Sequence, residues 1–149
     1  MQVSTAEVER RMARFEAACR QAGLKLTHQR TEIYRELAAT GEHPDAEAVY
    51  RAVRQRIPTI SLDTVYRTLW RLTDLGLINT LELPHERQRF DANTEPHHHF
   101  VCRQCGYTRD IHRSSFRRPS VPRAARRLGN VETMHVEFRG LCPKCAGSK

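Results

Sequence analysis

Long apolar runs are absent from this sequence of 149 residues. No run approaches the roughly 18 consecutive apolar residues that a membrane-spanning helix needs, so we expect no membrane partner. The first residues, MQVSTAEVERRMARF, also lack the apolar stretch of a secretory signal peptide. The expected location is therefore the cytoplasm. A mean hydropathy of −0.65 is typical of a soluble protein.

Cysteine is scarce, and its arrangement argues against a disulfide framework. Four of the five cysteines form two CxxC pairs, Cys102/Cys105 and Cys142/Cys145. In a reducing compartment such pairs are typical metal ligands. The fifth, Cys19, falls in an expected helix, where we predict a small buried apolar residue rather than a reactive thiol.

Acidic residues are outnumbered, 17 against 25 Lys and Arg, so the formal net charge is +8. Such an excess favours a polyanionic partner. The distribution is uneven: residues 1–84 hold 12 basic and 11 acidic residues (+1), and residues 85–149 hold 13 and 6 (+7). Much of the excess lies in Arg113–Arg127, which has six arginines and no acid. We interpret this segment as a solvated face, with an additional DNA or partner contact as the alternative. Charge alone therefore does not place a DNA-binding surface in the first half.

Helix signals occupy the first half of the chain. Side chains that can cap a helix precede each of four amphipathic stretches, at Ser4, Thr27, Asp45 and either Ser61 or Asp63. The fourth stretch, SLDTVYRTLWRLTDLG, has apolar residues at helical spacing and ends at Gly76.

Two β-prone runs follow, LINTLEL and RQRFDA, separated by Pro84-His85-Glu86, and they predict a hairpin. Short helices followed by a hairpin are typical of a winged helix. From His97 onward the sequence predicts strands that carry cysteine turns, with a short helix over Pro122–Leu128. The fold class is therefore α+β, with domains over residues 1–84 and 85–149.

The two CxxC pairs, separated by residues 106–141, predict a structural zinc site. Two such turns supply four thiolates, which complete a tetrahedron around Zn²⁺. The alternatives are a redox dithiol and an iron–sulfur cluster. A thioredoxin-type pair opens a helix, and neither pair is expected to do so.

Three adjacent histidines precede the first CxxC pair. Side chains alternate along a strand, so His97 and His99 share one face and His98 points away. Asp91 lies six residues before His97, and Asp110 follows the first CxxC pair. A set of two His and two Asp suits Fe(II), Mn(II) or Zn(II). Spacing alone leaves the alternative of an exposed polar strand open.

Enzymes that use zinc need an open coordination position and a general base. The sequence contains no HExxH motif and no carboxylate that is clearly placed as a base. A zinc-dependent hydrolase is thus a remote alternative, and we expect no enzyme. A protein-binding zinc ribbon would not account for the winged helix.

Six landmarks carry a resemblance to a known family: LTHQR (26–30), HPDAEAVY (43–50), SLDTVYRTL (61–69), RFD (89–91), HHHFVCRQCG (97–106) and GLCPKC (140–145). Because these landmarks occur in this order and spacing, the chain resembles the ferric uptake regulator family over nearly its full length. The resemblance implies a transcriptional repressor with an N-terminal winged-helix DNA-binding domain. It also implies a C-terminal α/β dimerisation domain with a four-cysteine zinc site, and a homodimer that binds a double-stranded DNA operator.

The resemblance adds one ligand that spacing does not predict, His43 in the HPDAEAVY landmark. The implied regulatory Fe²⁺ or Mn²⁺ site is His43, Asp91, His97, His99 and Asp110. This set resembles the peroxide-sensing branch, because iron-sensing members more often carry glutamate where aspartate stands here. In that branch Fe(II) reacts with hydrogen peroxide and a bound histidine is oxidised, here His43 or His97, whereas Mn(II) represses without that reaction. Iron sensing or zinc sensing is the alternative within the family.

Nucleic-acid contacts are expected from the fourth helix, whose polar set is Ser61, Thr64, Tyr66, Arg67 and Arg71. Tyr66 and Arg67 are the predicted base or sugar-phosphate contacts, by resemblance to the TVYR motif. The alternative for Tyr66 is a half-buried aromatic residue. Phosphate contacts are predicted at Lys25, Gln29, Arg30 and Arg51.

Overall fold

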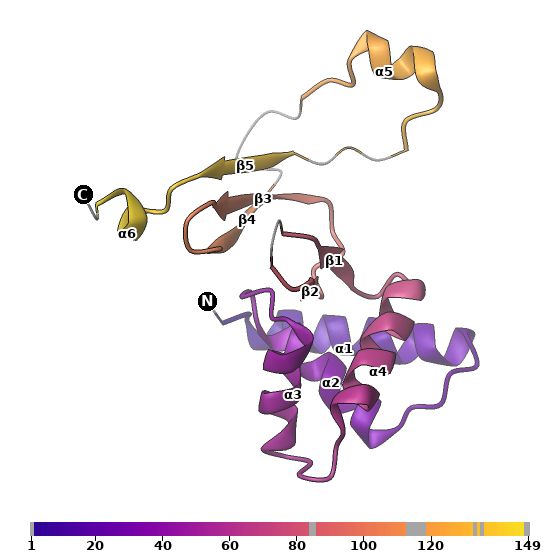
Figure 1. Cartoon of the computed structure of the whole chain (residues 1–149). Coiled ribbons are helices and arrows are strands. Elements are labelled where there is room, and N and C mark those ends of the chain that lie inside the picture. The colour runs from indigo at the N-terminus through magenta and orange to yellow at the C-terminus, as the bar shows by residue number, and fades with distance from the viewer. Residues whose placement is uncertain (1, 84–85, 113–118, 133, 135, 148–149) are drawn as a thin grey trace. The chain divides into compact units, whose positions relative to one another are not determined.

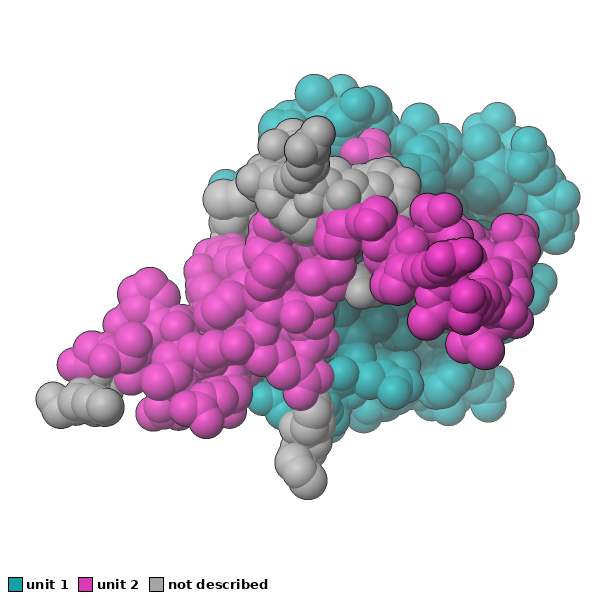
Figure 2. Space-filling view, turned by 90° about the horizontal axis from the view of Figure 1, so that it is seen from above, with its two compact units in different colours: residues 1–94 teal, residues 95–149 magenta. Residues whose placement is uncertain are grey.

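The computed structural model describes residues 2–83, 86–112, 119–132, 134 and 136–147. The chain divides into two compact units, Met1–Thr94 (unit 1) and Glu95–Lys149 (unit 2), which are coloured teal and magenta in Figure 2. Each unit is described by itself. No helix among these residues is both long and apolar enough to cross a membrane.

Unit 1 begins with four helices, labelled in Figure 1: α1 (Thr5–Gln21), α2 (His28–Ala39), α3 (Ala46–Arg54) and α4 (Leu62–Asp74). Every one starts after a capping residue predicted from sequence, at Ser4, Thr27, Asp45 and Ser61. In each case the side-chain oxygen accepts a hydrogen bond from the backbone N–H three residues on, which would otherwise lack a partner within the helix. The predicted capping is confirmed at all four helices.

The core of unit 1 is formed by the apolar stripes of these helices. Phe15 of α1 stacks on Tyr34 of α2, with ring centroids 4.5 Å apart. Val65, Leu69 and Leu72 of α4 are fully buried in the same cluster. The same cluster includes Ile33 and Leu37 of α2, Val49 and Val53 of α3, Ile78 just before β1, and Phe90 of β2. The predicted buried position of Cys19 is confirmed, and burial raises the pKa of its thiol despite the nearby Arg30.

A two-stranded hairpin completes unit 1. Strand β1 (Asn79–Leu81) pairs antiparallel with β2 (Arg89–Asp91), so that Asn79 lies opposite Asp91. The hairpin is the predicted one; Pro84 and His85, the start of its predicted connection, lie outside the described residues. Because β2 pairs with β1 and Phe90 packs into the helical core, unit 1 extends to Thr94 rather than ending at residue 84.

Unit 2 is built on a three-stranded mixed sheet of order β4-β3-β5. Strand β3 (His97–Cys102) pairs antiparallel with β4 (Thr108–His112) and parallel with β5 (Glu137–Gly140). Two short helices, α5 (Arg123–Leu128) and α6 (Pro143–Ala146), lie before and after β5 in the chain (Figure 1). The predicted helix near Pro122–Leu128 is confirmed as α5.

Candidate metal centres and nucleic-acid interface

Four cysteine sulfurs converge in unit 2. Cys102 ends β3 and Cys105 lies in the turn that follows, while Cys142 and Cys145 bracket the start of α6. All four Sγ atoms lie within 4.8 Å of one another, and the Cys105 and Cys142 sulfurs are 3.7 Å apart. Zinc–sulfur bonds of about 2.3 Å in a tetrahedron place sulfurs about 3.8 Å apart, so the donor set fits zinc. The predicted four-cysteine zinc site is confirmed.

Backbone amides prepare this site for a cation. The Cys142 N–H donates to the Cys102 sulfur at 3.3 Å. This hydrogen bond and a second from the Cys105 backbone lower the pKa of Cys102 to about 6. Cys102 is therefore a thiolate at neutral pH, which is the form that binds metal.

The prediction that neither CxxC pair opens a helix is wrong for the second pair. Cys142 is the N-cap of α6, and Pro143 occupies the first turn, where proline loses no hydrogen bond. A redox dithiol is still not the arrangement found, because the sulfurs of both pairs converge, with Cys105 of one pair 3.7 Å from Cys142 of the other.

A second cluster in unit 2 contains two histidines and one aspartate. The Nε2 atoms of His97 and His99 are 2.9 Å apart, and each lies 3.3–3.4 Å from Oδ1 of Asp110. Ligand atoms about 2.1 Å from one ion and at right angles to each other are about 3.0 Å apart, so the three atoms can share an ion. Two histidines with one carboxylate form the ligand set typical of non-haem Fe(II).

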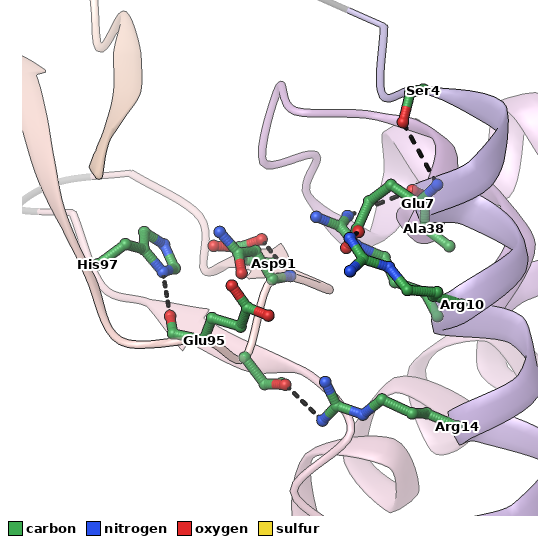
Figure 3. A network of polar contacts seen from close by, with 11 residues as sticks. Ser4, Glu7, Arg10, Arg14, Ala38, Asp91, Glu95 and His97 are labelled. Atoms are coloured by element: carbon green, nitrogen blue, oxygen red, sulfur yellow. Dashed lines mark hydrogen bonds and ion pairs between the residues drawn. The ribbon is translucent and has the colours of Figure 1, made fainter. Parts of the chain in front are cut away.

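Strand geometry and one carbonyl orient these rings. His97 Nδ1 lies 2.6 Å from the Glu95 carbonyl oxygen. This contact is the dashed line between the two residues in Figure 3. A proton on Nδ1 leaves Nε2 free of hydrogen and able to bind metal. His98 points the other way, and its Nδ1 accepts a hydrogen bond from the Val136 N–H at 3.0 Å. The predicted alternation of the three histidines is confirmed.

Unit 1 contains a buried pair of one histidine and one aspartate, the same residue types as in the cluster of unit 2. His43 Nε2 lies 3.3 Å from Oδ2 of Asp91, and both side chains are buried. The other Asp91 oxygen accepts the Asn93 N–H at 2.7 Å, in the manner of an Asx turn. His43 has φ +50°, the left-handed region that costs a non-glycine residue free energy. A strained backbone at a buried ligand candidate is consistent with a functional constraint.

The segment that carries Asp91 toward unit 2 is tied to the rest of unit 1. The Arg14 guanidinium donates to Thr94 Oγ1 at 2.7 Å, a contact drawn in Figure 3. The Asn79 side-chain amide donates to the Asn93 carbonyl at 3.4 Å. These supporting residues and Glu95 were not predicted from the sequence. For Asn93 a signal existed, because the order Asp-Ala-Asn is compatible with an Asx turn.

The residues predicted to contact DNA lie on three helices and one loop of unit 1. Ser61 caps α4 by accepting the Thr64 N–H, and the hydroxyl oxygens of the two residues are 2.9 Å apart. Tyr66, Arg67 and Arg71 are exposed on α4, and Arg67 Nε donates to the Asp63 carboxylate at 2.9 Å. The predicted phosphate contacts are exposed at Lys25 and Arg51 and partly buried at Gln29 and Arg30.

Of the Arg-rich segment, residues 113–118 lie outside the described part of the chain. In α5 the side chains of Arg123, Arg126 and Arg127 are exposed, in agreement with the predicted solvated face.

Comparison with known proteins gives a consistent result. Residues 21–139 match the model of the ferric uptake regulator family. The peroxide-responsive repressor PerR of Staphylococcus aureus (strain Mu50 / ATCC 700699) is 32% identical over 147 residues, which cover 97% of this chain and 98% of that protein.

Solved structures with the same fold include the Helicobacter pylori ferric uptake regulator Fur, described as having three functional metal-binding sites. It has a TM-score of 0.74 at 23% identity and covers 100% of this chain and 99% of its own. A zinc-bound manganese uptake regulator has a TM-score of 0.63 at 27% identity, covering 85% and 97%. A zinc uptake regulator complexed with zinc and DNA has a TM-score of 0.62 at 21% identity, covering 97% of each chain.

Proposed function

The chain belongs to the ferric uptake regulator family of metal-responsive transcriptional repressors, and from this premise we propose that it is a repressor that senses hydrogen peroxide. In this proposal Fe(II) or Mn(II) holds the protein on its operator. Peroxide releases the operator by oxidising a histidine ligand of the Fe(II) form. Like its family, the chain is a regulator and not an enzyme.

The observation that carries the proposal is the donor set of the two incomplete metal sites. Unit 2 contributes His97, His99 and Asp110, and unit 1 contributes His43 and Asp91. Two ligands are too few for a stable transition-metal site, whereas five nitrogen and oxygen ligands suit Fe(II) or Mn(II) and leave one of six octahedral positions for peroxide. Thiolates, which would favour zinc or copper(I), are absent from this set.

Chain length supports a shared ion. Only residues 92–96 separate Asp91 from His97. Six peptide steps span at most about 20 Å, so one ion can reach ligands on both sides of the segment. An ion that binds both sets gains its full binding free energy only in the arrangement that brings them together, and it therefore shifts the population toward that arrangement.

The readout we propose is operator binding by a homodimer. Two α4 helices of a dimer enter successive major grooves when their spacing is about 34 Å. A metal-dependent arrangement of unit 1 relative to unit 2 would set that spacing. Oxidation of a ligand lowers its affinity for the ion, and the favoured arrangement is lost.

The direct test is mass spectrometry of the Fe(II)-loaded protein after one equivalent of peroxide. Trypsin, which cleaves after Lys and Arg, releases His43 in residues 36–51 and His97 in residues 90–103. When bound, Fe(II) supplies the electrons that cleave the O–O bond, and we expect a gain of about 16 Da at His43 or His97. The Mn(II)-loaded protein should show no gain.

His98 is an internal control, because it lies in the same peptide as His97 but on the opposite face of β3. Fragment spectra should place the added oxygen on His97 and not on His98. An Fe(II)-loaded protein that binds DNA but gains no oxygen would point instead to a plain iron or manganese sensor. Binding restored by Zn(II) alone at the His/Asp set would point to a zinc sensor.

A further inference from the structure

Trp70 is an exposed tryptophan on α4. It is the only tryptophan in the chain, and 59% of its surface is exposed. On the same helix Val65, Leu69 and Leu72 are fully buried. Of the large apolar side chains in the described parts of the chain, only Leu128 is more exposed. Trp70 therefore does not serve the core of unit 1.

The exposed face of α4 has a particular composition. Its members recur at helical spacing and are Asp63, Tyr66, Arg67, Trp70, Arg71 and Asp74. Two arginines and two aspartates cancel, and Arg67 donates directly to Asp63 at 2.9 Å. A surface that binds phosphates carries a net positive charge. A face with no net charge and two aromatic rings is better suited to base edges, which are polar or apolar and uncharged.

We propose that Trp70 makes an apolar contact with the C5 methyl group of a thymine in the major groove, and so specifies a T·A pair in each operator half-site. The inference rests on the proposed operator binding through α4. The thymine methyl is the apolar group that the major groove presents, and the indole offers the larger apolar surface of the two exposed rings.

The helix geometry gives the position of that thymine. Trp70 lies four residues after Tyr66, which is about 6 Å along the helix axis. Base pairs are about 3.4 Å apart along the duplex. A helix in the major groove is inclined to the duplex axis, and in zinc fingers residues three or four apart on the helix contact successive bases. The thymine read by Trp70 is therefore about one base pair from the base nearest Tyr66.

Fluorescence of the unmodified protein gives the first test, because Trp70 is the sole source of indole emission. The probe is a duplex selected from a random pool by the Mn(II)-loaded protein. Adding it should shift the emission to shorter wavelength in the presence of Mn(II) and leave it unchanged with a chelator. An emission that already shifts with protein concentration in the absence of DNA would mean that a second copy covers Trp70, and it would overturn the inference.

The second test removes the methyl group alone. Each thymine of the selected duplex is replaced in turn by deoxyuridine, and affinity is measured for the wild type, Trp70→Gln and Trp70→Phe. One replacement per half-site should weaken wild-type binding about 15-fold, because each of the two buried methyl groups contributes roughly a factor of four. The same replacement should have no effect on Trp70→Gln, while Trp70→Phe should stay close to the wild type.

The outcomes separate this inference from the proposed function. Because Trp70 is exposed, its variants should keep the melting temperature of the wild type. If the wild type retards the selected duplex but Trp70→Gln loses no affinity, or every deoxyuridine affects both proteins equally, the inference fails and the operator function stands. If the Mn(II)-loaded wild type selects no duplex, the proposed function fails.

Discussion

Unit 1 and unit 2 stabilise their folds by different means. Unit 1 contains an apolar cluster drawn from four helices and a hairpin, in which Phe15, Leu37 and Leu69 are at most 1% exposed. In the described part of unit 2 the buried apolar residues are Val101, Cys102 and Cys142, and two of these are zinc ligands. An apolar core holds the first unit, whereas the second depends on a metal.

This difference affects how a regulatory ion can act. Burying apolar surface stabilises unit 1 whatever the metal supply, so α4 is formed in advance. Small domains that bury little apolar surface commonly require a structural metal. The zinc site keeps β3 in place, and β3 in turn carries His97 and His99. The proposed regulatory site therefore requires the zinc site without being part of it.

The largest expected effect tests this contrast directly. Removing zinc from the full chain with a strong chelator should unfold unit 2 and leave unit 1 folded, since structural zinc contributes about 10–16 kcal/mol in small zinc domains. Hydrogen exchange followed by peptide mass spectrometry should show lost protection over β3, β4 and β5 and retained protection over α1, α2 and α4. Equal protection in both units after zinc loss would contradict the contrast.

The reciprocal change is made in the core of unit 1. Leu69→Ala removes a fully buried side chain and should lower the free energy of unfolding of unit 1 by about 2–5 kcal/mol. Zinc content, measured by a colorimetric assay, should stay at one ion per chain. Leu26→Ala is the matched control, because Leu26 is 39% exposed and its truncation leaves little cavity. Loss of zinc in Leu69→Ala would mean that the units do not fold independently.

A smaller effect is expected where the regulatory site alone is changed. His97→Ala should weaken Mn(II)-dependent operator binding on the order of 100-fold, because the ion no longer favours one arrangement of the units. Zinc content and melting temperature should remain those of the wild type. Gel retardation over a Mn(II) titration measures the effect, with His98→Ala as control. Equal loss in the control would indicate damage to β3 instead of loss of a ligand.

The smallest change concerns a single cap in unit 1. Thr27→Ala removes the hydroxyl that accepts the Arg30 N–H at the start of α2 and should cost about 1 kcal/mol of stability. Thr27→Ser retains the acceptor and should cost less. Urea denaturation followed by circular dichroism measures both variants. A lower stability of Thr27→Ala with unchanged zinc content would again show that the stability of unit 1 and the zinc site of unit 2 are independent.

Local features were the ones that could be predicted from sequence. Capping at Thr27 and Asp45 depends on a side chain and a backbone N–H three residues away. The separation of His98 from its two neighbours follows from the alternation of any strand. The extension of unit 1 to Thr94 could not be predicted, because it depends on Phe90 packing against helices that are distant in sequence.

Supporting contacts escaped prediction for the same reason. No sequence motif marks the Glu95 carbonyl that orients His97 or the Arg14 side chain that donates to Thr94. Most polar residues can make such contacts, so the pattern is not specific. The helix after Cys142 was missed because one turn of four residues gives no apolar period to detect.

By itself the sequence determined which chemistry is available: four thiolates in two pairs, imidazoles alternating on a strand, and a helix whose polar set contains arginines and a tyrosine. These properties depend on neighbours within a few residues, where backbone geometry is nearly fixed. The tertiary structure alone decided that the sulfurs of Cys105 and Cys142 lie 3.7 Å apart and that Trp70 remains exposed. Such outcomes depend on how distant segments pack, and the free energy of packing is shared among many residues that no local pattern contains.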